Sequence, residues 1–231
     1  MNVFIADIQD SQAFLNAEES WHCCKVLRHK AGDTIGIING KGMHYEARLE
    51  LVNEKACRAR LTGQGRAEPK RPCYLHMAVA PTKQIDRSEW MLEKMVEIGI
   101  DEISFMQCKN SERLKINPER MSRISESAVK QSQRATIPLL HGMRDFKNLC
   151  AEQDYTLKLI AHCEPGIKVD LRELSFNHQK ILCLIGPEGD FSPDEVDFAL
   201  KQGFKPVTLG PHRLRTETAA LYLCQAAALL S

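Results

Sequence analysis

The sequence predicts an α/β protein in which a small β-barrel precedes a mostly parallel sheet covered by helices. Two apolar stretches, TLKLIAHC at 156–163 and KILCLIG at 180–186, show no alternation of polar and apolar residues. Stretches of this kind are typical of strands that a parallel sheet buries on both faces. Strand patterns alternate with helical patterns from residue 73 onward, which favours the same arrangement.

The N-terminal part of the chain has a different pattern. Residues 33–40, 43–52 and 56–63 are strand candidates, the last two with clear polar–apolar alternation, and the turn NGKG at 39–42 separates the first two. Residues 20–33 fit one short helix that leads into the first of these strands. Short strands with turns between them, within about 70 residues, predict a small β-barrel.

A linker separates the two patterns. The stretch TGQGRAEPKRPC, residues 62–73, combines glycine, proline and charge and lacks apolar periodicity. We therefore expect two domains, residues 1–70 and residues 73–231.

The second domain should contain strands and helices in regular order. Asn117 before Pro118 predicts a helix N-cap, Ser192 to Glu195 form a capping box, and Gly99 is a plausible C-cap. The predicted strands are 73–80, 102–107, 156–163, 180–186 and 206–210, and the predicted helices are 86–98, one from 118, one from 193 to about 203, and one from about 216 to the end.

The composition disfavours several classes of protein. The net charge of +1 is not that of a general polyanion binder, although residues 109–134 carry seven basic and three acidic residues, a pattern that a solvated helix face would also explain. Nine irregularly spaced cysteines predict reduced thiols in a cytoplasmic protein. No apolar run reaches the roughly 20 residues of a membrane helix. The eight histidines show no metal-ligand spacing, so we expect no metal.

Ligands of open parallel sheets bind beyond the carboxyl ends of the strands. Three turns of this sequence fall there: AHCEPG at 161–166, GPEGDFS at 186–192 and GPHRLRTET at 210–218. Their glycines would expose peptide groups to a ligand. The dinucleotide motif GxGxxG, the P-loop and the serine-hydrolase motif GxSxG are all absent, which disfavours those three classes.

Two segments near the C-terminus together form a pattern that is specific to one protein family. IGPEGDFSPDE at 185–195, followed by LGPHRLRTETAAL at 209–221, resembles the RsmE family of 16S rRNA uracil-N3 methyltransferases, which belongs to the SPOUT superfamily. EKMVEIGI at 93–100, AVKQSQRATIP at 128–138 and HCCKVLRHKAGD at 22–33 are similar to further segments of that family in the same order. One departure is visible, since the family usually reads GPEGG and this chain has Asp190 at the last position.

The resemblance implies a fold, a cofactor and an oligomeric state. It implies a parallel sheet whose C-terminal part forms a trefoil knot, and a PUA-like barrel that binds RNA. The cofactor would be S-adenosyl-L-methionine, held by the three turns, and a homodimer would complete the site. The cofactor-binding residues would be Ala161, His162, Gly186, Glu188, Gly189, Leu209, Gly210, Leu214, Arg215, Thr216 and Ala219.

The same resemblance implies roles for two polar residues at the start of the last helix. Loss of the uracil N3 proton spreads negative charge onto O2 and O4, and Arg215 is the candidate donor that stabilises it. Glu217 is a candidate base, and it could instead be an ion-pair partner that orients Arg213 or Arg215.

The expected partner is ribosomal RNA, within the assembled small subunit. Its phosphates should contact basic residues of both domains, namely Lys25, Arg28, Lys83, Arg87, Arg113 and Arg134. Two alternatives stay open: an RNA-binding assembly factor with impaired catalysis, for which Asp190 would be a symptom, and a SPOUT methyltransferase that acts on another RNA, such as a tRNA ribose.

Overall fold

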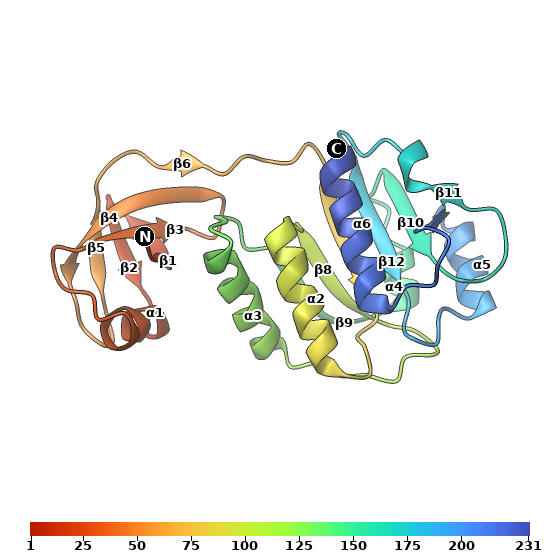
Figure 1. The fold of residues 1–231 in the computed structure, drawn as a ribbon, viewed down its shortest axis with the longest axis horizontal. Coiled ribbons are helices and arrows are strands. Elements are labelled where there is room, and N and C mark those ends of the chain that lie inside the picture. The colour runs from red at the N-terminus through yellow and green to blue at the C-terminus, as the bar shows by residue number, and fades with distance from the viewer. The chain divides into compact units, whose positions relative to one another are not determined.

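The structure, a computed structural model, describes all 231 residues and divides into two compact units (Figure 1). The first unit comprises residues 1–70 together with 126–137, and the second comprises 71–125 and 138–231. Residues 126–137 were expected in the second domain, whereas in the structure they belong to the first unit. This segment contains the end of helix α3 (Pro118–Gln131).

The first unit is a five-stranded barrel. Strands β3, β1, β2, β5 and β4 pair in that order, and a pairing between β3 and β4 closes the ring. Only β1 and β3 are parallel within the ring. The strands of this unit are β1 (Val3–Gln9), β2 (Gln12–Leu15), β3 (Thr34–Ile38), β4 (Met43–Leu51), β5 (Arg58–Leu61) and β6 (Arg66–Ala67).

Alternation along the strands builds the core of the barrel. Ala47 and Leu49 of β4 are buried, while their neighbours Arg48 and Glu50 point outward. The helix expected within 20–33 begins earlier, as α1 (Ala17–Trp21), because Asn16 Oδ1 accepts a hydrogen bond from the Glu19 N–H at 2.8 Å. The chain continues from α1 into a π-helical turn, η1 (His22–Val26).

The stretch predicted to be a linker is partly ordered against the first unit. β6 pairs with β4, and the Glu68 carboxylate accepts hydrogen bonds from Arg134 Nε at 2.9 Å and Thr136 Oγ1 at 2.7 Å. Burial raises the pKa of Glu68, but the bonds from Thr136 and Arg134 outweigh burial and hold that pKa below its usual value. The linker prediction missed this contact because its partner lies more than 60 residues away.

The second unit contains a seven-stranded sheet in the order β11, β13, β10, β12, β7, β8, β9, and every neighbouring pair is parallel. The parallel sheet predicted from the sequence is therefore confirmed, while the knot stays a prediction. The strands are β7 (Tyr74–Val79), β8 (Glu102–Gln107), β9 (Leu139–Asp145), β10 (Leu157–Ala161), β11 (Val169–Asp170), β12 (Lys180–Ile185) and β13 (Lys205–Thr208).

Helices cover both faces of this sheet. α2 (Ile85–Ile98) and α6 (Thr216–Leu230) pack together, and α6 lies on β7 and β12. On the other face, α4 (Phe146–Cys150) and α5 (Pro193–Lys201) share a core with the alternate β12 residues Leu182 and Leu184. A short 3-10 turn, η2 (Leu171–Glu173), follows β11.

The predicted helix caps are confirmed. Gly99 ends α2 with φ +112°, Asn117 Oδ1 accepts from the Arg120 N–H at 3.1 Å, and Ser192 and Glu195 form the capping box of α5. All nine cysteines are free thiols. None of the helices combines the length and apolar character needed to cross a membrane.

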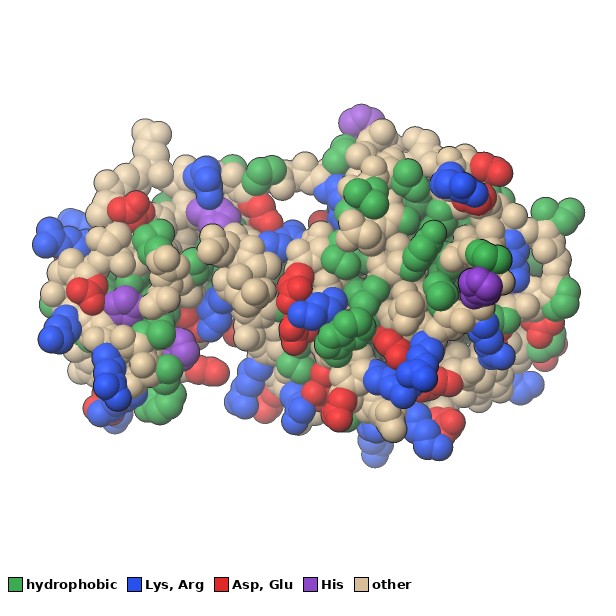
Figure 2. All heavy atoms as spheres, viewed as in Figure 1, with side chains coloured by type: hydrophobic (Ala, Val, Ile, Leu, Met, Phe, Trp, Pro, Cys, Tyr) green, Lys and Arg blue, Asp and Glu red, His purple; other side chains and the backbone are tan.

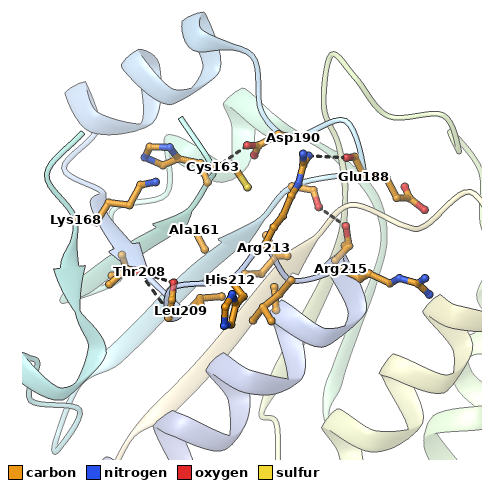
Figure 3. Close-up of a pocket in the computed structure, with 18 of the residues that line it drawn as sticks. Ala161, Cys163, Lys168, Glu188, Asp190, Thr208, Leu209, His212, Arg213 and Arg215 are labelled. Atoms are coloured by element: carbon orange, nitrogen blue, oxygen red, sulfur yellow. Dashed lines mark hydrogen bonds between the residues drawn. The ribbon is translucent and has the colours of Figure 1, made fainter. Parts of the chain in front are cut away.

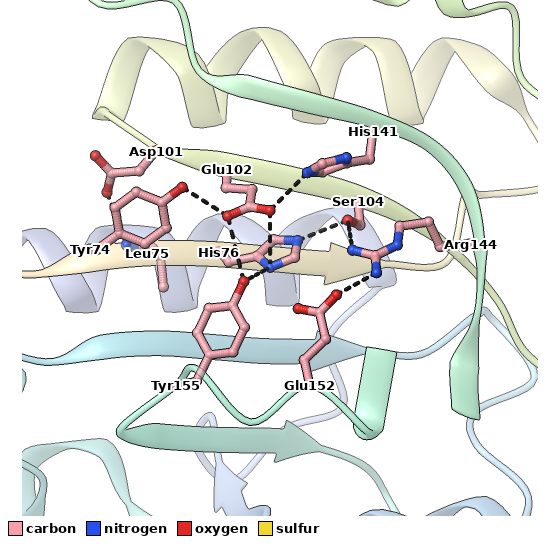
Figure 4. Close-up of polar contacts among 10 residues, drawn as sticks. All are labelled: Tyr74, Leu75, His76, Asp101, Glu102, Ser104, His141, Arg144, Glu152 and Tyr155. Carbon is pink, nitrogen blue, oxygen red and sulfur yellow. Dashed lines mark hydrogen bonds and ion pairs between the residues drawn. The ribbon is translucent and has the colours of Figure 1, made fainter. Parts of the chain in front are cut away.

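A buried polar network lies at the amino ends of the central strands, away from the strands' carboxyl ends (Figure 4). His76 of β7 is fully buried, and its ring bonds to Tyr155 Oη at 2.6 Å and Ser104 Oγ at 2.8 Å. Glu102 accepts from Tyr74 Oη at 2.8 Å and lies 2.7 Å from His141 Nε2. Burial lowers the pKa of His76 to about 4, so the ring is neutral at pH 7.

Candidate functional site

Three loops meet at the carboxyl ends of β10, β12 and β13 and enclose a cavity of about 550 Å³ (Figure 3). They are the three turns singled out in the sequence, and the first turn of α6 completes the wall. β7, β8 and β9 follow one another toward one edge of the sheet, whereas β10 to β13 lie on the other side of β7, so the strand order reverses between β7 and β12. The cavity lies beside this reversal, beyond the carboxyl ends of the strands, where ligands of open parallel sheets bind.

The loop after β12 begins with Gly186, and any other residue at this position would force neighbouring atoms to move. A Cβ atom at Gly186 would lie 3.0 Å from the ring of Phe191. The Gly186 carbonyl accepts a hydrogen bond from Thr216 Oγ1 at 3.0 Å, which fixes the start of α6 to this loop. The turn is closed by the Asp190 N–H, which donates to the Pro187 carbonyl at 2.9 Å.

The loop after β13 brings two arginines to the cavity. Gly210 has φ +113°, a conformation that favours glycine, and allows the chain to turn after β13. Arg213 extends toward Glu188, with Nη2 3.5 Å from the Glu188 carbonyl, whereas the Arg215 side chain extends away from the residues of the other two loops (Figure 3). Arg215 is also the N-cap residue of α6.

The loop after β10 contributes His162, Cys163 and Lys168 to the wall. Both ring nitrogens of His162 are buried without a hydrogen-bond partner, and burial lowers the pKa of this side chain. Burial also raises the pKa of the Cys163 thiol, and the Asp190 carboxylate beside it raises that pKa further. The loop therefore presents a neutral imidazole and a protonated thiol.

Side chains of both charges surround the cavity. Lys168, Arg213 and Arg215 are cationic, and Glu188 and Asp190 are anionic. A wall of this kind, with exposed backbone at its glycines, suits a ligand that carries both charges together with groups that accept and donate hydrogen bonds. No group of three or more histidine, cysteine, aspartate or glutamate side chains is arranged to hold a metal ion.

Ten of the eleven residues expected to bind a cofactor line this cavity. They are Ala161, His162, Gly186, Glu188, Leu209, Gly210, Leu214, Arg215, Thr216 and Ala219. The structure places the eleventh, Gly189, against Asn110, whose Nδ2 donates to the Gly189 carbonyl at 3.2 Å.

Comparison with known proteins agrees with this geometry. Residues 69–228 match the family model described as an RNA methyltransferase domain, and residues 15–62 match the RNA methyltransferase PUA domain. Ribosomal RNA small subunit methyltransferase E of Mesomycoplasma hyopneumoniae is 34% identical over 166 residues, which cover 69% of this chain and 70% of that protein. The chain belongs to the ribosomal RNA small subunit methyltransferase E family.

Solved structures of this family have the same fold. A probable rRNA methyltransferase from Porphyromonas gingivalis superposes with a TM-score of 0.90 at 40% identity, covering 100% of this chain and 98% of that one. A ribosomal RNA small subunit methyltransferase E from Neisseria gonorrhoeae, bound to S-adenosyl methionine, gives 0.86 at 26% identity, with the same two coverages. The PUA match lies within the barrel of the first unit, and the methyltransferase match includes the parallel sheet of the second unit.

The two residues expected to be catalytic lie in different surroundings. Arg215 lines the cavity, whereas Glu217 does not. Glu217 is buried, with Oε1 3.9 Å from Nη1 of Arg87 and Oε2 without a hydrogen-bond partner. Arg213 or Arg215 was the expected ion-pair partner of Glu217, but in the structure the partner is Arg87 of α2. Glu217 is the second residue after the N-cap Arg215, and the turn of the helix directs its side chain away from the cavity.

The basic residues expected to contact RNA are already engaged within the chain to different degrees. In the second unit, Arg113 donates to the carbonyls of Thr82 and Lys83, at 3.0 and 2.6 Å, and Lys83 pairs with Glu112 at 2.8 Å. These bonds stiffen the segment after β7, whose Lys83 N–H also donates to Glu188 Oε1 at 2.9 Å.

In the first unit, Lys25 pairs with Glu54 at 2.8 Å, Arg134 pairs with Glu68, and Arg28 has φ +57°. The Lys25 pair is exposed, so it costs little to exchange for a phosphate. Arg134 is less than one-fifth exposed, and its bond with Glu68 fixes the end of the linker.

Sequence reasoning missed several residues of the site. Lys168, Thr208 and His212 line the cavity, and Asn110 supports it from the loop after β8. The signal for Asn110 was present, because it follows a predicted strand at the same carboxyl edge as the three turns. Lys168 had no such signal, since its position depends on the path of the chain between β10 and β11.

Proposed function

We propose that this chain transfers a methyl group from S-adenosyl-L-methionine to N3 of a uridine in small-subunit ribosomal RNA, in the cytoplasm. The observation that supports the proposal most is the cavity at the carboxyl ends of β10, β12 and β13, in a chain that also carries a PUA-type barrel. The N3 position comes from the resemblance of residues 185–195 and 209–221 to the uracil-N3 methyltransferases.

The residues around the cavity fit this cofactor. A volume of about 550 Å³ is within the range of small-molecule sites. Backbone groups at Gly186 and Gly210 can meet an adenine edge and a ribose, and the nearby charges of both signs can meet the amino-acid part of the molecule. The cofactor supplies a methyl group on a sulfonium, which is electrophilic and needs no further activation.

The chain must then assist a weak nucleophile. Uracil N3 carries a proton at neutral pH, and its loss leaves negative charge on O2 and O4. Arg215 stands at the N-terminus of α6, where the guanidinium and the helix N–H groups both favour an anion. We assign to Arg215 the stabilisation of that charge, which is strongest in the transition state.

Glu217 has a different role in this account. It points to Arg87 rather than into the cavity, so it positions Arg87 and does not remove the N3 proton. Arg87 is about one-third exposed and can contact the RNA substrate while Glu217 restrains it. The N3 proton then leaves to solvent or to a group of the RNA complex.

The RNA substrate is recognised through both units. N3 is hidden by base pairing, so the target base must be unpaired or flipped into the cavity. We assign four basic residues to contacts with phosphates: Lys25, Arg28, Lys83 and Arg87. Arg113 and Arg134 instead hold neighbouring segments in place, because their side chains bond to groups within the chain. An assembled small subunit is the substrate that offers shape as well as sequence.

The chain should act as a homodimer. Apolar side chains lie on the surface over α2 and α6 (Figure 2). Trp90 of α2 and Tyr222 and Leu229 of α6 are 46%, 50% and 73% exposed. Contiguous exposed apolar surface and exposed aromatic residues are typical of a protein interface. A symmetric pair would cover this surface in both copies.

The function can be tested in cells that lack the gene. Nucleoside mass spectrometry of their small-subunit RNA should show the loss of one N3-methyluridine, and the wild-type gene should restore it. Unmethylated tRNA ribose with intact rRNA would instead support the alternative substrate. A complete set of modifications in the deletion strain would contradict the proposal.

A further inference from the structure

Asp190 connects two of the three loops around the cavity (Figure 3). Its carboxylate accepts two backbone hydrogen bonds, with Oδ1 2.8 Å from the Phe191 nitrogen and Oδ2 2.7 Å from the Cys163 nitrogen. The first bond is local. The second runs from the loop after β12 to the loop after β10, two segments that are far apart in the sequence.

The backbone at this position would suit glycine better. Asp190 has φ +62°, in the left-handed region, where a side chain is strained unless other contacts hold it. Aspartate tolerates this conformation better than most residues because its short side chain can bond to nearby backbone groups. The two bonds to Phe191 and Cys163 are such contacts, and they explain how aspartate is accommodated where the resembling family carries glycine.

The other side of the same turn is held independently. Asn110 Nδ2 donates to the carbonyls of Gly189 and Asp190, at 3.2 and 3.1 Å. These bonds use the backbone of residues 189–190, so a glycine at position 190 would keep them. Only the bonds made by the carboxylate would be lost, and with them the connection to the loop that carries His162 and Lys168.

We propose that Asp190 is a positioning residue that holds the loop 162–168 against the turn 187–190 and thereby sets the width of the cavity for the cofactor. The effect on cofactor binding rests on the proposed function, whereas the contact between Asp190 and Cys163 does not. Hydrogen bonds to an ionised acceptor are stronger than those between neutral groups, so the Cys163 bond is one of the firmer links between the two walls.

Hydrogen exchange of the Cys163 amide, measured without cofactor, reports the contact directly. In Asp190→Gly this amide should exchange at least tenfold faster than in wild type, because its acceptor is gone. Calorimetry should show S-adenosyl-L-methionine binding weakened by roughly tenfold, since the loop must be ordered on binding. The thermal midpoint should move by no more than about 2 °C, because glycine relieves the left-handed backbone.

Two further variants separate positioning from other effects. Asp190→Asn keeps one oxygen that can accept from Cys163, but it loses the acceptor of the Phe191 N–H and the charge. It should therefore restore much of the protection of Cys163 and part of the affinity that Asp190→Gly loses. His178→Gly is a matched control, since His178 is exposed, has φ +58° and makes no side-chain hydrogen bond of this kind. It should leave both measurements unchanged.

Unchanged Cys163 exchange in Asp190→Gly would overturn the inference. An Asp190→Asn chain that binds cofactor as weakly as Asp190→Gly would also overturn it, because the charge and not the contact would then matter. A wild-type chain that binds no cofactor would contradict the proposed function instead. The exchange measurement would still decide whether Asp190 holds the loop.

Discussion

Arg215 is the residue on which the proposed chemistry depends most. Arg215→Ala should lower the single-turnover rate of methylation roughly 100-fold, which is the usual effect of removing one preorganised donor from a developing anion. Affinity for S-adenosyl-L-methionine should change by less than about threefold, because the interaction strengthens only in the transition state. Arg172→Ala is a control, since Arg172 is exposed and pairs with Asp170. A near wild-type rate in Arg215→Ala would remove this arginine from the mechanism.

Glu217 provides a second test at the level of single residues. If Glu217 positions Arg87, Glu217→Gln should lower the rate roughly tenfold, equivalent to about 1.4 kcal/mol, by the same factor at every pH. Arg87→Ala should produce a similar loss, and the double variant should be little worse than either single one. Rates should be measured across pH 6–9 at saturating cofactor. Recovery of Glu217→Gln at high pH would show instead that Glu217 removes the N3 proton.

Strand β7 carries a prediction about pH and stability at the scale of an element. His76 is buried and neutral, with a pKa of about 4 in the folded chain against about 6.5 in the unfolded one. The unfolded chain therefore binds more protons between these values, and stability falls as the pH drops through this window. Between pH 7 and pH 5 the contribution of His76 to this loss is about 2 kcal/mol.

Urea unfolding of His76→Gln, which does not titrate, should show a correspondingly smaller loss of stability between pH 7 and pH 5. His178→Gln is the control, because His178 is exposed and lies outside the network. Equal pH dependence in wild type and His76→Gln would show that the imidazole takes up its proton in the folded chain, contrary to its burial.

Elements with strong local signals were predicted well from the sequence. α2, α5 and α6 have caps or turns that act within four residues, and the apolar strands β10 and β12 need no partner to be recognised. β1, β2, β6, β9 and β11 were not predicted. β6 and β9 were missed because each is defined by the strand it pairs with. β9 is half-exposed along its length and has a register shift against β8, so its sequence lacks a strand period.

In the candidate site, too, features with local sequence signals were predicted and contacts between distant segments were not. The three turns were predicted because glycine and proline follow apolar strands, and ten expected residues line the cavity. The partners of Glu217 and Asp190 were not predictable, because Arg87 and Cys163 reach them through the tertiary fold. Ion pairs between distant segments leave no pattern in a single sequence.

At the scale of the whole molecule, the apolar surface over α2 and α6 predicts a dimer. Light scattering at micromolar concentration should give twice the chain mass of 26.1 kDa. Tyr222→Glu combined with Leu229→Glu should shift the protein to monomer, because two buried charges would meet across the symmetry axis. Phe14→Glu, a substitution of an exposed apolar residue in the first unit, should leave the dimer intact. A wild-type monomer would contradict the prediction.

The central claim is that the cavity between the three loops supports methyl transfer to uracil N3 of small-subunit rRNA. The most direct measurement incubates the purified chain with S-adenosyl-L-methionine carrying a deuterated methyl group and with small subunits from cells that lack the gene. Nucleoside mass spectrometry should then find the deuterated methyl group on N3 of a single uridine. Label at a ribose or at another base, or no label in the RNA despite bound cofactor, would contradict the account.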